Sequence, residues 1–227
     1  MTLKSLLIGG ALALVACTAH AGTLFTQPWD GTQDFYATQT ETKGFVGVSA
    51  IAYDDFHLDG PSNVTGIDFT GGYFLFKPLT AIEGFTATLY ADNAGAPGAV
   101  ISTDYVTAFN ETVVADMQFM YVRHYSVAFG PVALGEGDYW MSLVPKLEYV
   151  QWMIGASSVG NLNAIQTFNG VTKDRQINLA FDIMGERASG GGAVPEPASW
   201  ALMVVGIGLV GGALRTRRTA GRAVSAA

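Results

Sequence analysis

The sequence has few of the residues that bind transition metals or form covalent cross-links. Its 227 residues include one cysteine, Cys17, so no disulfide bond can form within the chain. His57 and His124 are the two histidines after residue 21, and they lie far apart, without the HxH or HExxH spacing of zinc sites. We therefore expect neither a metal site nor a cofactor.

Sequence motifs of common catalytic sites are also missing. The stretch 47–51, Gly-Val-Ser-Ala-Ile, lacks the second glycine of a nucleophile elbow, and no glycine-rich phosphate loop is present. Asp54 and Asp55 are adjacent, so in a strand they point to opposite faces and cannot act together as acid and base. Each could pair with a distant carboxylate, as in glycosidases. We interpret them as an acidic strand edge capped by Phe56, and expect no enzymatic activity.

Positive charge is scarce between the two ends of the chain. Residues 22–193 contain seven Lys/Arg and eighteen Asp/Glu, a net charge of −11, against −7 for the whole sequence. An acidic domain repels phosphate backbones, so we expect no nucleic-acid binding. Residues 22–187 are enough for one hydrophobic core and too few for two domains.

Amphipathic helical patterns are almost absent between residues 22 and 187. Short alternating runs rich in Val, Ile, Thr, Phe and Tyr are separated instead by Gly, Asn, Asp and Pro, the pattern of antiparallel β-structure. Eight to eleven strands without crossover helices predict an all-β fold, a jelly-roll-like β-sandwich over residues 22–187. The expected strands include 82–91, 117–129, 138–144 and 178–185, and two less regular runs at 44–56 and 63–76.

Two connections carry the residues that tight turns require. Residues 91–98 read ADNAGAPG and residues 135–138 read GEGD. Asn and Gly supply left-handed backbone conformations there, and Pro fixes its own φ. Asp92 and Asn93 could also offer oxygens to calcium, but we favour a plain turn.

Aromatic residues are plentiful, which leaves two uses open for the tryptophans of the central region. Trp29, Trp140 and Trp152 could form a flat platform on which sugars stack, giving a candidate ligand-binding site. Trp140 and Trp152 fall in expected strands, where packing is the default. We therefore favour a place in the core or on a half-buried sheet face.

The N-terminal residues 1–21 have the features of a secretory signal peptide. Lys4 supplies a positive charge before the apolar stretch 5–17. Ala19-His20-Ala21 then forms a small-x-small cleavage site, and we expect cleavage after Ala21. Export would proceed through the secretion translocon.

A second form of N-terminal processing stays open. Residues 14–17, Leu-Val-Ala-Cys, resemble a bacterial lipobox, in which the cysteine is lipidated and becomes the first mature residue. We prefer cleavage after Ala21, because the Ala-His-Ala site is well formed and the chain carries another membrane signal near its other end.

That other signal follows a Gly-rich linker at residues 188–193. Residues 198–214 are uncharged, and as a helix they would span about 25 Å, just short of a hydrocarbon core of about 30 Å. We expect a transmembrane helix there, which would hold the protein in the membrane before processing.

A cluster of arginines predicts the orientation of this helix. Arg215, Arg217 and Arg218 follow the apolar stretch at once. Arginines after an apolar span stay on the cytoplasmic side, so residues 219–227 would form a cytoplasmic tail and the domain would lie outside. The signal peptide requires the same orientation.

The order of these features resembles a known sorting signal. Val194 precedes Pro195-Glu196-Pro197, and the apolar span and the arginines complete a stretch over residues 194–218 that resembles the PEP-CTERM signal of exported bacterial proteins. The resemblance implies processing by an exosortase-like enzyme that recognises Pro195, Glu196 and Pro197. Two prolines also keep the backbone extended, as a protease requires.

The central region resembles β-sandwich domains carried by PEP-CTERM proteins, over about residues 53–185. The shared elements include a DDF sequence followed by V-T-G-I, and an aromatic strand leading into a D-N-x-G-x-P-G turn. This resemblance implies an architecture and no activity.

These observations predict a non-enzymatic protein that is exported, anchored in the membrane and then found at the cell surface or in the extracellular matrix. The resemblance implies association with exopolysaccharide, in adhesion or biofilm formation. Two alternatives stay open: a carbohydrate-binding module that grips the exopolysaccharide through exposed aromatics, and a divergent glycan-active enzyme.

Overall fold

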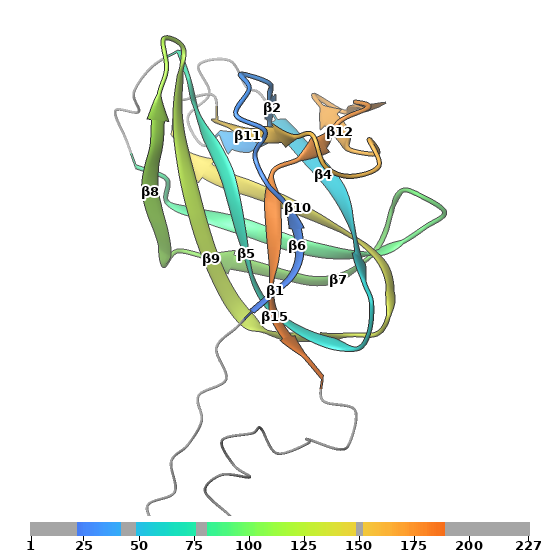
Figure 1. The fold of residues 1–227 in the computed structure, drawn as a ribbon. Coiled ribbons are helices and arrows are strands. Elements are labelled where there is room, and N and C mark those ends of the chain that lie inside the picture. The colour runs from blue at the N-terminus through green and yellow to red at the C-terminus, as the bar shows by residue number, and fades with distance from the viewer. Residues whose placement is uncertain (1–21, 42–48, 76–80, 149–151, 189–227) are drawn as a thin grey trace, which may run out of the picture. The chain divides into compact units, whose positions relative to one another are not determined.

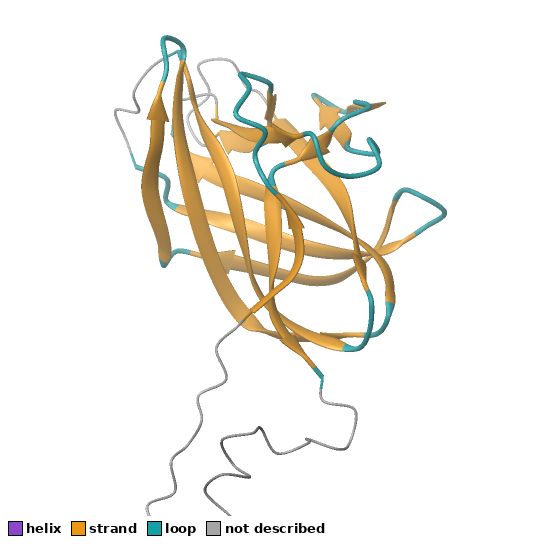
Figure 2. Ribbon diagram, viewed as in Figure 1, coloured by secondary structure: helices purple, strands orange, loops and turns teal. Residues whose placement is uncertain are grey.

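The computed structural model describes residues 22–41, 49–75, 81–148 and 152–188, which form strands and loops (Figure 1). Figure 2 shows no helix in this part of the chain, and hence none that could cross a membrane. The expected signal peptide and the expected transmembrane helix at 198–214 lie outside the described residues.

Fifteen strands form two sheets within the described residues. The first sheet contains β1 (Gly22–Gln27), β2 (Phe35–Ala37), β5 (Ser62–Phe74), β8 (Phe109–Asp116), β9 (Met120–Leu134), β11 (Trp152–Ser157), β14 (Asn178–Leu179) and β15 (Phe181–Arg187). The second contains β3 (Gln39–Glu41), β4 (Ser49–Leu58), β6 (Gly84–Asp92), β7 (Pro97–Val106), β10 (Gly137–Leu147), β12 (Ile165–Phe168) and β13 (Val171–Asp174).

The long strand β5 organises the first sheet. β9 pairs with one side of β5 from Ser62 to Phe74, while β15 and β11 share its other side. β8 pairs with β9 and β1 with β15, so that β8, β9, β5, β15 and β1 lie side by side in Figure 1. All of these pairings are antiparallel, and their side chains therefore alternate between an inner and an outer face.

In the second sheet, β10 lies between β4 and β6, with β7 beyond β6. The β12–β13 hairpin adds to the far side of β4. β6, β7 and β10 pass behind β9 and β5 in Figure 1, so the two sheets face each other as layers.

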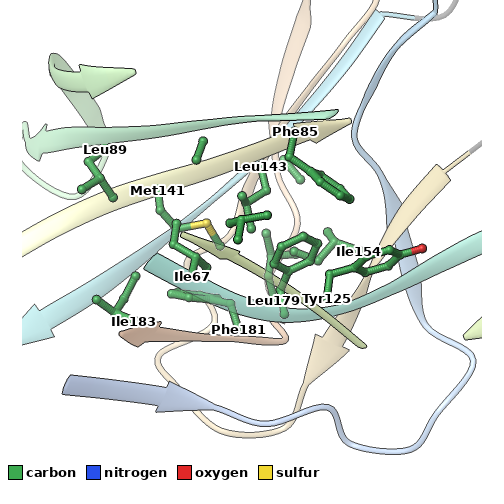
Figure 3. Packing of buried hydrophobic residues seen from close by; sticks show 14 of the residues in the cluster. Ile67, Phe85, Leu89, Tyr125, Met141, Leu143, Ile154, Leu179, Phe181 and Ile183 are labelled. Atoms are coloured by element: carbon green, nitrogen blue, oxygen red, sulfur yellow. The ribbon is translucent and has the colours of Figure 1, made fainter. Parts of the chain in front are cut away.

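Aromatic rings join the two layers. Phe69 of β5 and Phe85 of β6 have ring centroids 5.0 Å apart. Tyr125 of β9 lies 5.3 Å from Phe69 and 5.2 Å from Phe85, and Trp152 of β11 lies 6.0 and 5.7 Å from the same two rings. Figure 3 shows Phe85 and Tyr125 among the aliphatic side chains of this core. Burial of one such side chain contributes roughly 1.5–3 kcal/mol to folding.

The expected alternation of buried and more exposed residues is confirmed where one face of a strand packs in the core. In the stretch 82–91, Phe85, Ala87 and Leu89 are 0, 2 and 1 % exposed and belong to the core. The two sheets and the absence of helices among the described residues confirm an all-β, sandwich-like fold. Its jelly-roll topology stays a prediction.

The prediction for 117–129 was wrong at its start. It included Met117 and Phe119 in the strand, but β9 begins at Met120 and Phe119 is 49 % exposed. The N–H of Met117 donates to the carbonyl of Met120 (2.9 Å), which makes these residues a turn between β8 and β9. β4 begins at Ser49, and residues 44–48 of the predicted strand 44–56 lie outside the described part.

Arg123, which breaks the apolar pattern of β9, is accommodated by ion pairs. Its side chain lies 2.6 Å from Asp116 and 3.6 Å from Glu111 of β8, and the residue is 7 % exposed. A buried guanidinium requires such partners, because an unpaired buried charge is strongly destabilising.

Candidate functional site

The residues expected to direct sorting are not among those that the structure describes. These are the recognition residues Pro195, Glu196 and Pro197, the orienting residues Arg215, Arg217 and Arg218, and the cleavage-site residues Ala19 and Ala21. The geometry below therefore concerns the β-domain alone.

Two of the three candidate tryptophans, Trp140 and Trp152, are buried. Trp152 lies in the core and Trp140 on the opposite face of β10 from Met141, yet both are 0 % exposed. The indole Nε1 of Trp140 donates to Asp92 Oδ1 (2.8 Å). Neither ring can offer a face to a sugar, so their burial contradicts an exposed platform built on them.

Trp29 is half-buried and contributes to packing as well. Its ring lies 6.2 Å from the ring of Phe35, and its Nε1 is buried without a hydrogen-bond partner. Packing of Trp140 was the favoured interpretation of the sequence, although period-two alternation does not reveal that both faces of β10 are covered.

Asp54 and Asp55 point to opposite faces of β4, as expected. Asp54 is 0 % exposed and accepts hydrogen bonds at Oδ2 from the N–H of Leu179 (2.6 Å) and at Oδ1 from the N–H of Asp55 (3.0 Å). The amide of Gln27, oriented to satisfy its neighbours, adds a third donor at 3.0 Å. Burial raises the pKa of Asp54 well above its usual 3.8, against the opposing effect of the Leu179 hydrogen bond.

Two carboxylates on the outer face of the second sheet, Asp55 and Asp138, each have a polar side chain as partner. Asn161 donates to Asp55 Oδ2 (2.6 Å), and the Nδ1 atom of His57 lies 2.7 Å from Asp138 Oδ1. The hydrogen bond to Asp138 raises the pKa of His57, and burial raises the pKa of Asp55. These groups line a small cavity of about 190 Å³. His57, rather than a second carboxylate, lies opposite Asp138 in the strand register.

The turn at residues 91–98 uses its aspartate as a structural anchor. The carboxylate of Asp92 accepts hydrogen bonds from the N–H of Gly95 (3.1 Å) and from Trp140. Ala94 and Gly95 have φ of 53° and 81°, the left-handed conformation that such a turn requires. Among the described residues, no group of three or more His, Cys, Asp or Glu is placed to hold a metal ion.

A groove on the outer face of the first sheet was missed by the sequence analysis. It has a volume of about 520 Å³ and is lined by residues of β5, β8, β9 and β15, including Asp68, Asn110 and Ser126. Asp68 and Ser126 occupy outward positions of expected strands, which was a usable signal. Asn110 lies in β8, a strand that the sequence did not predict.

Comparisons with known proteins find the sorting signal. No curated protein and no solved structure matches the chain. Residues 193–218 match a family model described as the PEP-CTERM protein-sorting motif, within one residue of the predicted start. The chain therefore carries a PEP-CTERM protein-sorting motif at residues 193–218, joined to an all-β domain.

Proposed function

We propose that this protein is exported, anchored by a helix at residues 198–214, and processed by an exosortase-like enzyme, after which its β-domain works without catalysis at the cell surface. The match at residues 193–218 carries this proposal, because that motif suggests an exported substrate of exosortase. Association with exopolysaccharide or a biofilm matrix is part of the same proposal.

The chemistry of the domain supports a non-enzymatic role. Asp54 is buried among three donors, and the polar groups around His57 are engaged with one another. These hydrogen bonds hold the side chains of Asp54, His57 and Asp138 to their neighbours in the fold.

Mass spectrometry of the exported protein tests the sorting proposal. We expect the wild-type protein to yield no peptide beyond about residue 197. A variant with Pro195-Glu196-Pro197 replaced by three alanines should retain the C-terminal peptides, and so should the wild-type protein in cells without exosortase. Replacement of Gly190-Gly191-Gly192 by three alanines is the matched control and should be processed normally. An exported wild-type protein with an intact tail to Ala227 would overturn the proposal.

Glycan binding is the second candidate function. Sugar stacking on an exposed aromatic platform cannot involve Trp140 or Trp152, because both are fully buried. The groove on the first sheet favours a different form of it.

A further inference from the structure

The groove lies across four neighbouring strands, β8, β9, β5 and β15, which Figure 1 shows side by side. We call it the outer groove and define it by Thr65, Asp68, Phe109, Asn110, Ser126 and Met184, with a volume of about 520 Å³. This volume falls within the roughly 300–1,000 Å³ of small-molecule sites.

A row of polar side chains crosses the outer groove. Asn110 of β8 lies opposite Ser126 of β9, and Ser126 lies opposite Asp68 of β5. Asp182 of β15 continues the row opposite Asp68. Side chains directly opposite each other on antiparallel strands have Cβ atoms about 4.5–5.5 Å apart, so the four form a continuous polar strip.

Three of the four polar side chains of this strip have no hydrogen-bond partner among the described residues. Within the described part of the chain, Asp68, Asn110 and Ser126 make no side-chain hydrogen bond or ion pair with the protein, and Asp182 accepts one hydrogen bond, from Thr26. The carboxylates around His57 differ, because they already have partners. Unused donors and acceptors in a groove are available to a ligand.

The two carboxylates of the strip also face each other, and neither forms an ion pair with a cation of the described residues. The described arginines are engaged elsewhere: Arg123 with Asp116, Arg175 with Gln166, and Arg187 with Asp59. Like charges directly opposite on neighbouring strands are destabilising. Their cost to the fold is offset if a ligand donates hydrogen bonds to them.

The backbone of β5 is irregular where this strand lines the outer groove. The pairing of β5 shifts register between Val64 and Gly66 against β9, and at the same point against β15. Thr65, at this irregularity, lines the groove. Bulges bend a strand and re-aim its side chains, and they are frequent next to functional sites.

We propose that the outer groove binds a neutral, hydroxyl-rich glycan chain. Carboxylate, amide and hydroxyl groups in a row match the neighbouring hydroxyls of sugar rings, which donate to carboxylates in charge-assisted hydrogen bonds. Met184 provides apolar surface for the C–H faces of a sugar. The charges of Asp68 and Asp182 repel uronate, sulfate and phosphate groups. That the glycan comes from the cell's own matrix rests on the proposed function, whereas the binding chemistry does not.

Affinity electrophoresis of the purified exported protein tests this proposal. The probes are neutral and acidic fractions of extracellular polysaccharide from the producing cells, separated by anion exchange and cast into native gels. The neutral fraction should retard the wild-type protein, and Asp68→Ala should weaken binding about tenfold or more, because a hydrogen bond to a charged group is lost. Asn110→Ala and Ser126→Ala should weaken it several-fold.

Glu136→Ala is the matched control, because Glu136 is exposed in the turn between β9 and β10 and the charge change is the same. It should bind like the wild-type protein. Circular dichroism should show that each variant is folded, and Asp68→Asn provides a second variant of the same shape. Retardation by neither fraction, preference for the acidic fraction, or unchanged binding by both Asp68 variants would overturn the proposal. C-terminal processing is measured separately, so failure of either proposal is recognised independently.

Discussion

Asp54 and Asp68 are both strand aspartates, and their surroundings give them opposite roles. Asp54 is 0 % exposed and surrounded by donors, including the N–H of Leu179 at 2.6 Å. Asp68 lies on the outer face of β5 and makes no side-chain contact of this kind with the described residues. The first therefore supports the fold and the second is available to a ligand.

Replacement of these aspartates should separate stability from binding. Asp54→Ala leaves the N–H groups of Leu179 and Asp55 and the amide of Gln27 unpaired in the core, and we expect a loss of about 2–4 kcal/mol in the free energy of unfolding. Asp68→Ala should change it by less than about 0.5 kcal/mol. Urea denaturation measures both values. Equal losses in the two variants would contradict the assignment of roles.

The raised pKa of Asp54 also predicts a pH dependence. Above about pH 4 the unfolded chain releases this proton while the folded protein keeps it, so stability falls as the pH rises from 3.8 through the raised pKa. Asp54→Asn cannot titrate and should show a flatter profile. Urea denaturation at several pH values between 4 and 8 measures the difference, and parallel profiles for the two proteins would refute the prediction.

At the scale of elements, β5 depends on glycines where other parts of the core approach its backbone. A Cβ added at Gly71 would lie 2.3 Å from Cζ2 of Trp152 and 2.8 Å from the carbonyl oxygen of Met153. Trp152 is itself fixed between Phe69 and Tyr125. This packing requires a residue without a side chain at position 71.

Gly71→Ala should therefore destabilise the domain by about 3 kcal/mol, the upper end of typical overpacking. Gly130→Ala in β9 is the control, because an added Cβ there meets nothing within 4 Å. It should change stability by less than about 0.5 kcal/mol. Thermal unfolding compares the two variants, and a Gly71→Ala protein as stable as the control would show that Trp152 can move aside.

At the scale of the whole molecule, the N-terminal processing decides whether the exported protein has any cysteine. Cleavage after Ala21 removes Cys17, so the exported protein should begin at Gly22 and unfold identically with and without a reducing agent. Intact-mass measurement checks the first residue. An added lipid mass on Cys17 would establish the alternative form of processing.

Much of the fold followed from local patterns. Alternation in the stretch 82–91 identified the inner residues of β6, and the residues at 91–98 identified its turn, because both depend on neighbours in sequence. The start of β9 and the whole of β8 were missed. β8 is exposed along most of its length, so it has no apolar alternation to reveal it.

The candidate groove depended on information that no local pattern contains. Asp68 and Asp182 are far apart in sequence and become neighbours only through the register of β5 and β15. A shift of one residue in this register would have turned one of them to the inner face. Trp140 likewise meets Asp92 only because β10 pairs with β6, a strand distant in sequence.

The sequence by itself determined that the chain carries a sorting motif at 193–218, that it can form no internal disulfide, and that its central region is built of strands. Such features are read from composition and from order along the chain. Only the tertiary structure decided which aromatics are buried, which aspartate supports the core, and which polar groups meet in the outer groove. The reason is that burial and strand register arise from contacts between segments distant in sequence, and these contacts exist only once the two sheets have packed together.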